Sequence, residues 1–145
     1  MNVAADLRAE IDRVLPRLRA LDEADAMRDR GPGKWVRKEI LGHLIDSAAN
    51  NHQRFVRARL SDRLVFPPYE QDAWVALQGY RQRPWRELLD LWEVLNRHVA
   101  HVIASTPAER LATPCVIGDK APATLEWLMQ DYVRHMRHHL AQILG

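Results

Sequence analysis

Four stretches of this 145-residue chain carry apolar residues at every third or fourth position, which is the spacing of an amphipathic helix. They run from about residue 3 to 21, 35 to 60, 85 to 106 and 123 to 144. Most prolines lie between them and only 6 residues are glycine, which favours helix over strand. Each helix has to bury its apolar stripe, so the pattern predicts an all-α four-helix bundle with long crossover connections, in a single domain over residues 1–145.

The segments between these helices hold the remaining local signals. Pro16 lies inside the first stretch and predicts either a kink or two shorter helices. Residues 22–34 are polar, end in Gly-Pro-Gly and are expected to form a loop. The connection 61–84 is unusually long for a compact domain, with a short helix expected around Gln71–Leu77. The connection 107–122 is expected to hold a short extended piece at Cys115–Ile117.

The last helix separates its histidines by geometry. On a helical wheel its buried face places His139 inside the apolar arc and His135 at its edge, whereas His138 points away. The buried face is expected to comprise Leu125, Leu128, Met129, Tyr132, Met136, Leu140 and Ile143. Two imidazoles four residues apart lie on one helix face and can bind the same ion, although many surface helices carry such a pair by chance. Thr124 is positioned to cap the start of this helix.

The second helix carries a polar stripe along one edge of its apolar face. Its members are Glu39, His43, Asp46, Asn50 and Arg54. Polar groups beside a core need partners, because one left buried and unpaired costs about 1–3 kcal/mol. If His43 meets the other two histidines inside the bundle, three imidazoles surround an open coordination position, as in catalytic metal sites.

Each of these residues also has an ordinary structural interpretation. His43 alone is more often a hydrogen-bonded core histidine than a metal ligand. His135 and His139 can simply favour the C-terminal end of a helix dipole. The remaining members of the polar stripe can form a polar network between helices, and Glu39 can stabilise a first helical turn. The metal interpretation rests on all of these residues fitting one site together.

Three segments, taken in order, resemble the DinB/YfiT-like metalloenzyme family. Segment 35–55, WVRKEILGHLIDSAANNHQRF, resembles the first family signature of Trp, Glu, His-Leu-x-Asp and a later Arg. Segment 69–75, YEQDAWV, resembles its loop motif. Segment 124–144, TLEWLMQDYVRHMRHHLAQIL, resembles its terminal His-x-x-x-His helix with a following Gln-Ile. The resemblance covers the chain from about residue 3 to its end.

The resemblance implies an up-down-down-up four-helix bundle and, in many relatives, a homodimer. It also implies a divalent metal, zinc or nickel, on His43, His135 and His139. Relatives of this family include thiol S-transferases that use a low-molecular-weight thiol, a mycothiol-dependent isomerase and proteins described as metal-dependent hydrolases.

The sequence departs from the family pattern at three places. Val36 stands where Ser or Thr is usual, so Glu39 lacks the hydroxyl partner of a capping box. Glu70 replaces the usual Asp after the loop tyrosine. Residues 112–118 contain no histidine, although many relatives carry one there. The last departure bears on the substrate, whereas none of the three touches the metal ligands.

The main hypothesis is therefore an enzyme that uses the metal to activate a thiol or water, with thiol S-transfer ahead of hydrolysis. The catalytic candidates are Asp46 and Glu39, which can orient a ligand imidazole, and Arg54, which can hold a substrate carboxylate. Trp74 from the long connection is a candidate pocket wall. The competing hypothesis is a stress-response bundle that binds metal or ligand without turnover, with Trp127 and Phe66 as exposed contacts.

Charge, cysteine content and hydropathy argue against several other classes of protein. The 21 cations face 19 anions and no basic run stands alone, which argues against nucleic-acid binding. A single cysteine, Cys115, excludes an internal disulfide and a cysteine-based zinc site. The N-terminus lacks an apolar signal core and no stretch of eighteen apolar residues occurs, so we expect a cytoplasmic protein. His98 and His101 lack a third ligand for a second metal site.

Overall fold

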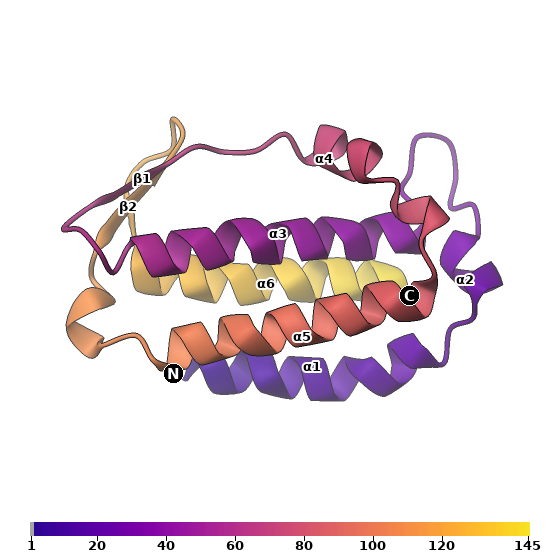
Figure 1. The fold of residues 1–145 in the computed structure, drawn as a ribbon, viewed down its shortest axis with the longest axis horizontal. Coiled ribbons are helices and arrows are strands. Elements are labelled where there is room, and N and C mark those ends of the chain that lie inside the picture. Colours follow the sequence, from indigo (N-terminus) through magenta and orange to yellow (C-terminus); the bar gives the residue numbers. More distant parts are fainter. Residues whose placement is uncertain (1) are drawn as a thin grey trace.

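The computed structural model describes residues 2–145 and contains the four long helices that the sequence predicts. They are α1 (Val3–Arg19), α3 (Arg37–Arg57), α5 (Trp85–Ala104) and α6 (Leu125–Leu144). Figure 1 shows them packed side by side with their axes nearly aligned. The all-α four-helix bundle is therefore confirmed.

The direction of each helix can be followed by colour in Figure 1. α1 leads away from the N-terminus, α3 and α5 both run back, and α6 returns in the direction of α1. Both α3 and α1 pack against α5 and α6, so α1 and α3 face each other diagonally. This is the up-down-down-up arrangement, and it makes α3 antiparallel to its neighbour α6.

The long connection follows from this topology. Because α3 and α5 are parallel neighbours, residues 58–84 have to travel the whole length of the bundle (Figure 1). On the way they form β1 (Leu64–Phe66), α4 (Gln71–Gln78) and a 3₁₀ turn at Tyr80–Gln82. The short helix expected at Gln71–Leu77 is confirmed, whereas the strand β1 was not predicted.

A small sheet closes one end of the bundle. β2 (Pro114–Ile117) pairs in parallel with β1, with Leu64 opposite Cys115. β3 (Ala123–Thr124) pairs antiparallel with β2. The extended piece expected at residues 115–117 is thus confirmed, and β1 forms because this distant segment supplies its hydrogen-bonding partner. Thr124 caps α6 as predicted, since its side-chain oxygen accepts the Trp127 N–H at 3.1 Å.

Two local expectations resolve differently. α1 is one continuous helix through Pro16, because the proline removes a single N–H while buried Val14 and Leu18 hold the turns on both sides. The loop expected over residues 22–34 contains a short helix, α2 (Glu23–Met27). Asp22 caps this helix through the Asp25 N–H at 2.7 Å, and the Asp25 carboxylate accepts the Asp22 N–H in return.

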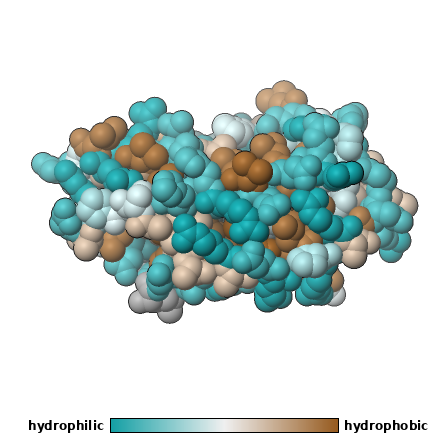
Figure 2. All heavy atoms as spheres, turned by 60° about the horizontal axis from the view of Figure 1, so that its bottom comes forward, coloured by the Kyte–Doolittle hydropathy of each residue, from teal (hydrophilic) through white to brown (hydrophobic). Residues whose placement is uncertain are grey.

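The helices bury the predicted apolar stripes in one core. Trp92, Phe55 and Met129 are among its largest fully buried side chains. On the face shown in Figure 2 most of the surface is hydrophilic, and apolar side chains appear in separate small groups. None of the helices among residues 2–145 is long and apolar enough to cross a membrane.

Candidate metal centre

Antiparallel packing of α3 and α6 brings three histidines together. His43 lies in the second turn of α3, and His135 and His139 lie in the last three turns of α6. Because the two helices run in opposite directions, the start of α3 lies beside the end of α6 (Figure 1). The two distant segments of sequence therefore converge at one end of the bundle.

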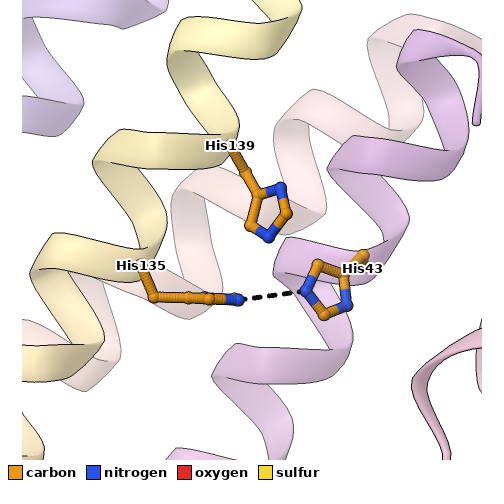
Figure 3. Close-up of side chains that lie close together, drawn as sticks. All are labelled: His43, His135 and His139. Carbon is orange, nitrogen blue, oxygen red and sulfur yellow. Dashed lines mark hydrogen bonds between the residues drawn. The ribbon is translucent and has the colours of Figure 1, made fainter.

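The three imidazoles point toward one another, as Figure 3 shows. His43 Nε2 and His135 Nε2 are 3.1 Å apart. The ring centroids of the three pairs are separated by 4.5 to 5.0 Å. One ring nitrogen from each residue lies within 4.8 Å of the other two.

This geometry fits a divalent metal. Nitrogens about 2.0–2.1 Å from one tetrahedral ion are about 3.3 Å from each other, close to the separation of the His43 and His135 nitrogens. His43 is 0% exposed, and its Nδ1 has no hydrogen-bond partner among residues 2–145. Three neutral nitrogen donors leave a fourth position open, which is the donor set of a catalytic site rather than a closed structural one.

Burial also leaves these imidazoles in the protonation state that a metal needs. Burial and, to a smaller extent, the neighbouring imidazoles together lower the pKa of His43 to about 3 and that of His135 to about 4. Burial lowers the pKa of His139 as well. The three rings are therefore neutral near pH 7, with lone pairs available for coordination.

Gln142 contacts the His139 imidazole at Nδ1. Its Oε1 lies 2.8 Å from His139 Nδ1 and accepts a hydrogen bond when that nitrogen carries the proton. Such a partner places the lone pair of His139 on Nε2, the other ring nitrogen. The sequence pattern includes Gln142 in the terminal motif without giving it a role, although its position three residues after His139 on one helix face is a usable signal.

Asp46 lies one turn after His43 and is 2% exposed. Its Oδ1 accepts hydrogen bonds from the Tyr80 hydroxyl at 2.6 Å and from Gln78 Nε2 at 2.7 Å, while its Oδ2 is buried without a partner among residues 2–145. Burial raises the pKa of the Asp46 carboxyl, which the two hydrogen bonds partly offset. The carboxylate thus joins the crossover segment to α3, and its orienting role toward an imidazole remains a prediction.

Glu39 is engaged away from the histidines. Its Oε1 accepts the Val36 N–H at 3.1 Å and pairs with Arg81 at 3.0 Å. It therefore makes one half of a capping box, the half that needs no hydroxyl at position 36. The structure gives its carboxylate a helix-capping role, and the expected contact with a ligand imidazole is not present among residues 2–145.

Arg54 lies farther along α3 and lines a cavity of about 240 Å³ that begins at His135. The cavity is lined by Ser47, Asn51, Arg54, Pro68, Tyr69, Gln71, Ile117, Lys120, Trp127, Leu128, Asp131, Tyr132 and His135. Trp74, the expected wall, is not among these residues and packs instead on Tyr69, with ring centroids 5.1 Å apart. On the side of the crossover segment, the cavity wall is formed instead by Pro68 and Tyr69, just before α4.

Four further residues take structural positions outside the histidine cluster. Asn50 bonds its own helix, donating to the Asp46 carbonyl at 2.9 Å. His138 is exposed, as the helical wheel predicts. Phe66 is half-buried against the core rather than exposed, while Trp127 is 46% exposed.

The remaining histidines gather on α3 and α5. The ring centroids of His52 and His98 are 5.0 Å apart, and those of His98 and His101 are 6.2 Å apart. Within residues 2–145, however, only His43, His135 and His139 bring three ligand atoms close enough to share an ion.

Comparison with known proteins places this site in a family. The model of the DinB superfamily matches residues 6–143. The "Putative metal-dependent hydrolase BH0277" of Halalkalibacterium halodurans is 28% identical over 124 residues, covering 86% of this chain and 72% of the relative. YfiT of Bacillus subtilis is 29% identical over 112 residues. This alignment covers 77% of the chain and 63% of YfiT, so the chain spans less than two thirds of that relative's length.

Solved structures show the same fold. The structure of YfiT, described as a probable metal-dependent hydrolase with an unusual four-helix bundle topology, superposes with a TM-score of 0.84 at 23% identity, covering 97% of this chain and 81% of YfiT. A mycothiol-dependent maleylpyruvate isomerase superposes with a TM-score of 0.79 at 12% identity, covering 97% of this chain and 59% of the isomerase. The chain is a member of the DinB superfamily of four-helix bundles, whose curated relatives are named as metal-dependent enzymes.

Proposed function

We propose that this protein is a metal-dependent thiol S-transferase with zinc or nickel bound by His43, His135 and His139. The observation that carries the proposal is the convergence of three neutral imidazoles, one buried and two half-buried, on one point with a cavity opening beside His135. A divalent cation held there supplies Lewis acidity, which lowers the pKa of a bound thiol or water.

The choice of a thiol over water rests on the acids around the site. Hydrolysis benefits from a positioned general base or acid within hydrogen-bond reach. The carboxylates of Asp46 and Glu39 are held by Tyr80, Gln78, Val36 and Arg81. A thiol that has lost its proton is already a competent nucleophile and needs no such group.

The residues of this chain then have limited tasks. The three imidazoles hold the cation, and Gln142 keeps a proton on His139 Nδ1. In the transfer, the thiol proton leaves to solvent and the sulfur bonds the electrophilic carbon, while the leaving group departs with the electrons of its broken bond. Asp46 is proposed as a group that orients the helix turn carrying His43.

The test is an assay of metal-loaded, untagged protein with low-molecular-weight thiols and monochlorobimane, in which chloride is the leaving group. The expected result is thioether formation well above the rate of the His43→Ala variant loaded in the same way. Equal rates for the two proteins would sink the transferase assignment.

Hydrolysis is the second candidate because the curated relatives carry that name. Ester and amide substrates assayed with the same two proteins separate the two reactions. A bundle that binds metal without turnover predicts no His43-dependent activity in either assay. The homodimer implied by the family is part of this proposal, and sedimentation equilibrium of the metal-loaded protein tests it.

A further inference from the structure

Arg54 is a half-buried cation without an acidic partner. Its Nε is buried and has no hydrogen-bond partner among residues 2–145. Its only marked contact in that part of the chain is aromatic, since the guanidinium carbon lies 5.4 Å from the centre of the Phe66 ring. Burial lowers the Arg54 pKa, and the group that partly offsets this is the neighbouring Tyr69 rather than a carboxylate. Removing a cation from water without pairing it is unfavourable, so the arrangement favours binding of an anion.

The cavity connects this cation to the metal centre. Ser47, Asn51 and Arg54 line it from α3, at positions four, eight and eleven residues after His43 and therefore on one helix face. Across from them, α6 contributes residues from Trp127 to His135. Seven residues of helix span about 10 Å, so the cavity is an elongated trough with an imidazole of the metal cluster at one end.

Positive charge is in excess at the end of the trough that is remote from the metal centre. Lys120, in the turn between β2 and β3, lines the cavity as a second cation. The only carboxylate in the lining is Asp131, which is half-exposed and pairs with Arg134 at 3.3 Å. The crossover segment contributes Pro68 and the Tyr69 ring to the cavity wall, and neither side chain carries a charge.

From this arrangement we infer that the substrate is an elongated small molecule with a carboxylate at one end, bound by Arg54 with Lys120, and its reacting thiol at the other end, beside His135. The inference rests on the proposed function for the thiol end, and on the unpaired guanidinium for the carboxylate end. The trough sets the distance between the two groups at about 10 Å. A guanidinium suits a carboxylate because it offers two parallel N–H donors.

Two thiols of equal length test the charge. Zinc-loaded protein is titrated by calorimetry with 8-mercaptooctanoate and with neutral 8-mercapto-1-octanol, which differ only in the terminal group. The acid is expected to bind about tenfold to a hundredfold more tightly, the range typical of a charge-assisted hydrogen bond. The short acid 3-mercaptopropionate, which cannot reach both ends of the trough, is expected to show no comparable gain over its alcohol.

Arg54→Gln and the matched Arg57→Gln variant assign the effect to one residue. Arg57 lies three residues further on α3, is exposed and bonds Gln53. Arg54→Gln should abolish the preference for the acid, while Arg57→Gln should keep it. The metal-free Arg54→Gln protein should be no less stable than Arg57→Gln, because it loses an unpaired cation rather than a structural ion pair. A clearly lower Tm for Arg54→Gln would assign Arg54 a structural role and overturn the inference.

Octanoate, which has no sulfur, separates this inference from the proposed function. Octanoate that binds in an Arg54-dependent way, together with thiols that leave the near-ultraviolet spectrum of nickel-loaded protein unchanged, would overturn thiol chemistry and keep the carboxylate subsite. Equal binding of the acid and alcohol thiols to the unaltered protein would overturn the subsite while leaving metal-dependent thiol transfer in place.

Discussion

The Tyr80 hydroxyl donates a 2.6 Å hydrogen bond to Asp46, and this bond joins the end of the crossover to the helix that carries His43. The ring of Tyr80 reaches Asp46 by lying directly on Gly42, where a Cβ atom would overlap the ring carbons. Gly42 lies next to His43 in the chain, so the same helix turn presents a metal ligand and a seat for the crossover.

Gly42→Ala should therefore destabilise the protein. A methyl group forces the Tyr80 ring out of its seat, and overpacking of this kind costs about 1–3 kcal/mol, more than alanine gains over glycine in a helix. Urea denaturation of the metal-free protein measures the change. The matched control is Ala49→Gly at an exposed position of the same helix, which measures the difference in helix propensity between the two residues without a packing change. A Gly42→Ala protein that gains as much stability as Ala49→Gly loses would show that the ring has room to move.

Loss of one imidazole should abolish stoichiometric metal binding. His43→Ala and His139→Ala each leave two ligands for an ion that usually needs three or four protein ligands. Elemental analysis of untagged protein is expected to give about one zinc or nickel per chain for the unaltered protein and for the exposed control His101→Ala, and far less for the two variants. If His43→Ala retained one ion per chain, the metal would have to bind somewhere other than this histidine cluster.

Gln142→Ala should weaken metal binding without removing it. The amide oxygen of Gln142 fixes the ring and proton of His139 at 2.8 Å, and loss of such a partner lowers metal affinity about 10-fold to 100-fold. Competition with a chromogenic chelator measures the affinity. Gln130→Ala, earlier on the same helix and bonded to Glu126, is the matched control. Identical affinities for the two variants would show that Gln142 does not position the ligand.

The metal-free protein should lose stability as the pH falls below about 6.5, the ordinary pKa of histidine. The folded-state pKa values of His43 and His135 are lowered to about 3 and about 4, so between these values and 6.5 the unfolded chain binds protons that the folded chain does not. Buried His43 alone then lowers the free energy of unfolding by about 1.4 kcal/mol for each pH unit in that range.

Urea denaturation in the presence of a chelator, repeated from pH 7.5 to 4, measures this dependence. The His43→Gln variant should show a shallower decline, because its residue 43 takes up no proton on unfolding. Parallel curves for the two proteins would contradict the lowered pKa of His43.

The polar stripe of α3 shows how much of the site the local sequence pattern can predict. The wheel placed His43 beside the core, and packing against α6 buried it completely. The same stripe did not distinguish Glu39, whose carboxylate caps its own helix, from Asp46, which binds a residue 34 positions away. Local spacing reports which face a side chain occupies, whereas its hydrogen-bond partner depends on the segment packed opposite.

The cavity wall is a second example. Trp74 was predicted there because it is aromatic and lies in the long connection, yet Pro68 and Tyr69 occupy the wall. Their position follows from β1, which pairs with β2 and pins the start of the crossover to the hairpin. A three-residue strand has no signal of its own in the sequence, because its stability comes from a partner about fifty residues away.

Helical periodicity by itself determined the four long helices, their buried faces and the separation of His135 and His139 from His138, because these depend only on residues three or four apart. The family resemblance supplied the prediction that His43 joins them. It also supplied the up-down-down-up order that makes α3 antiparallel to α6. Only the tertiary structure decided that the crossover ties Tyr80 to Asp46, and that Arg54 lines a cavity with its Nε unpaired. Those features arise from burial and charge shared between distant segments, which no local spacing encodes.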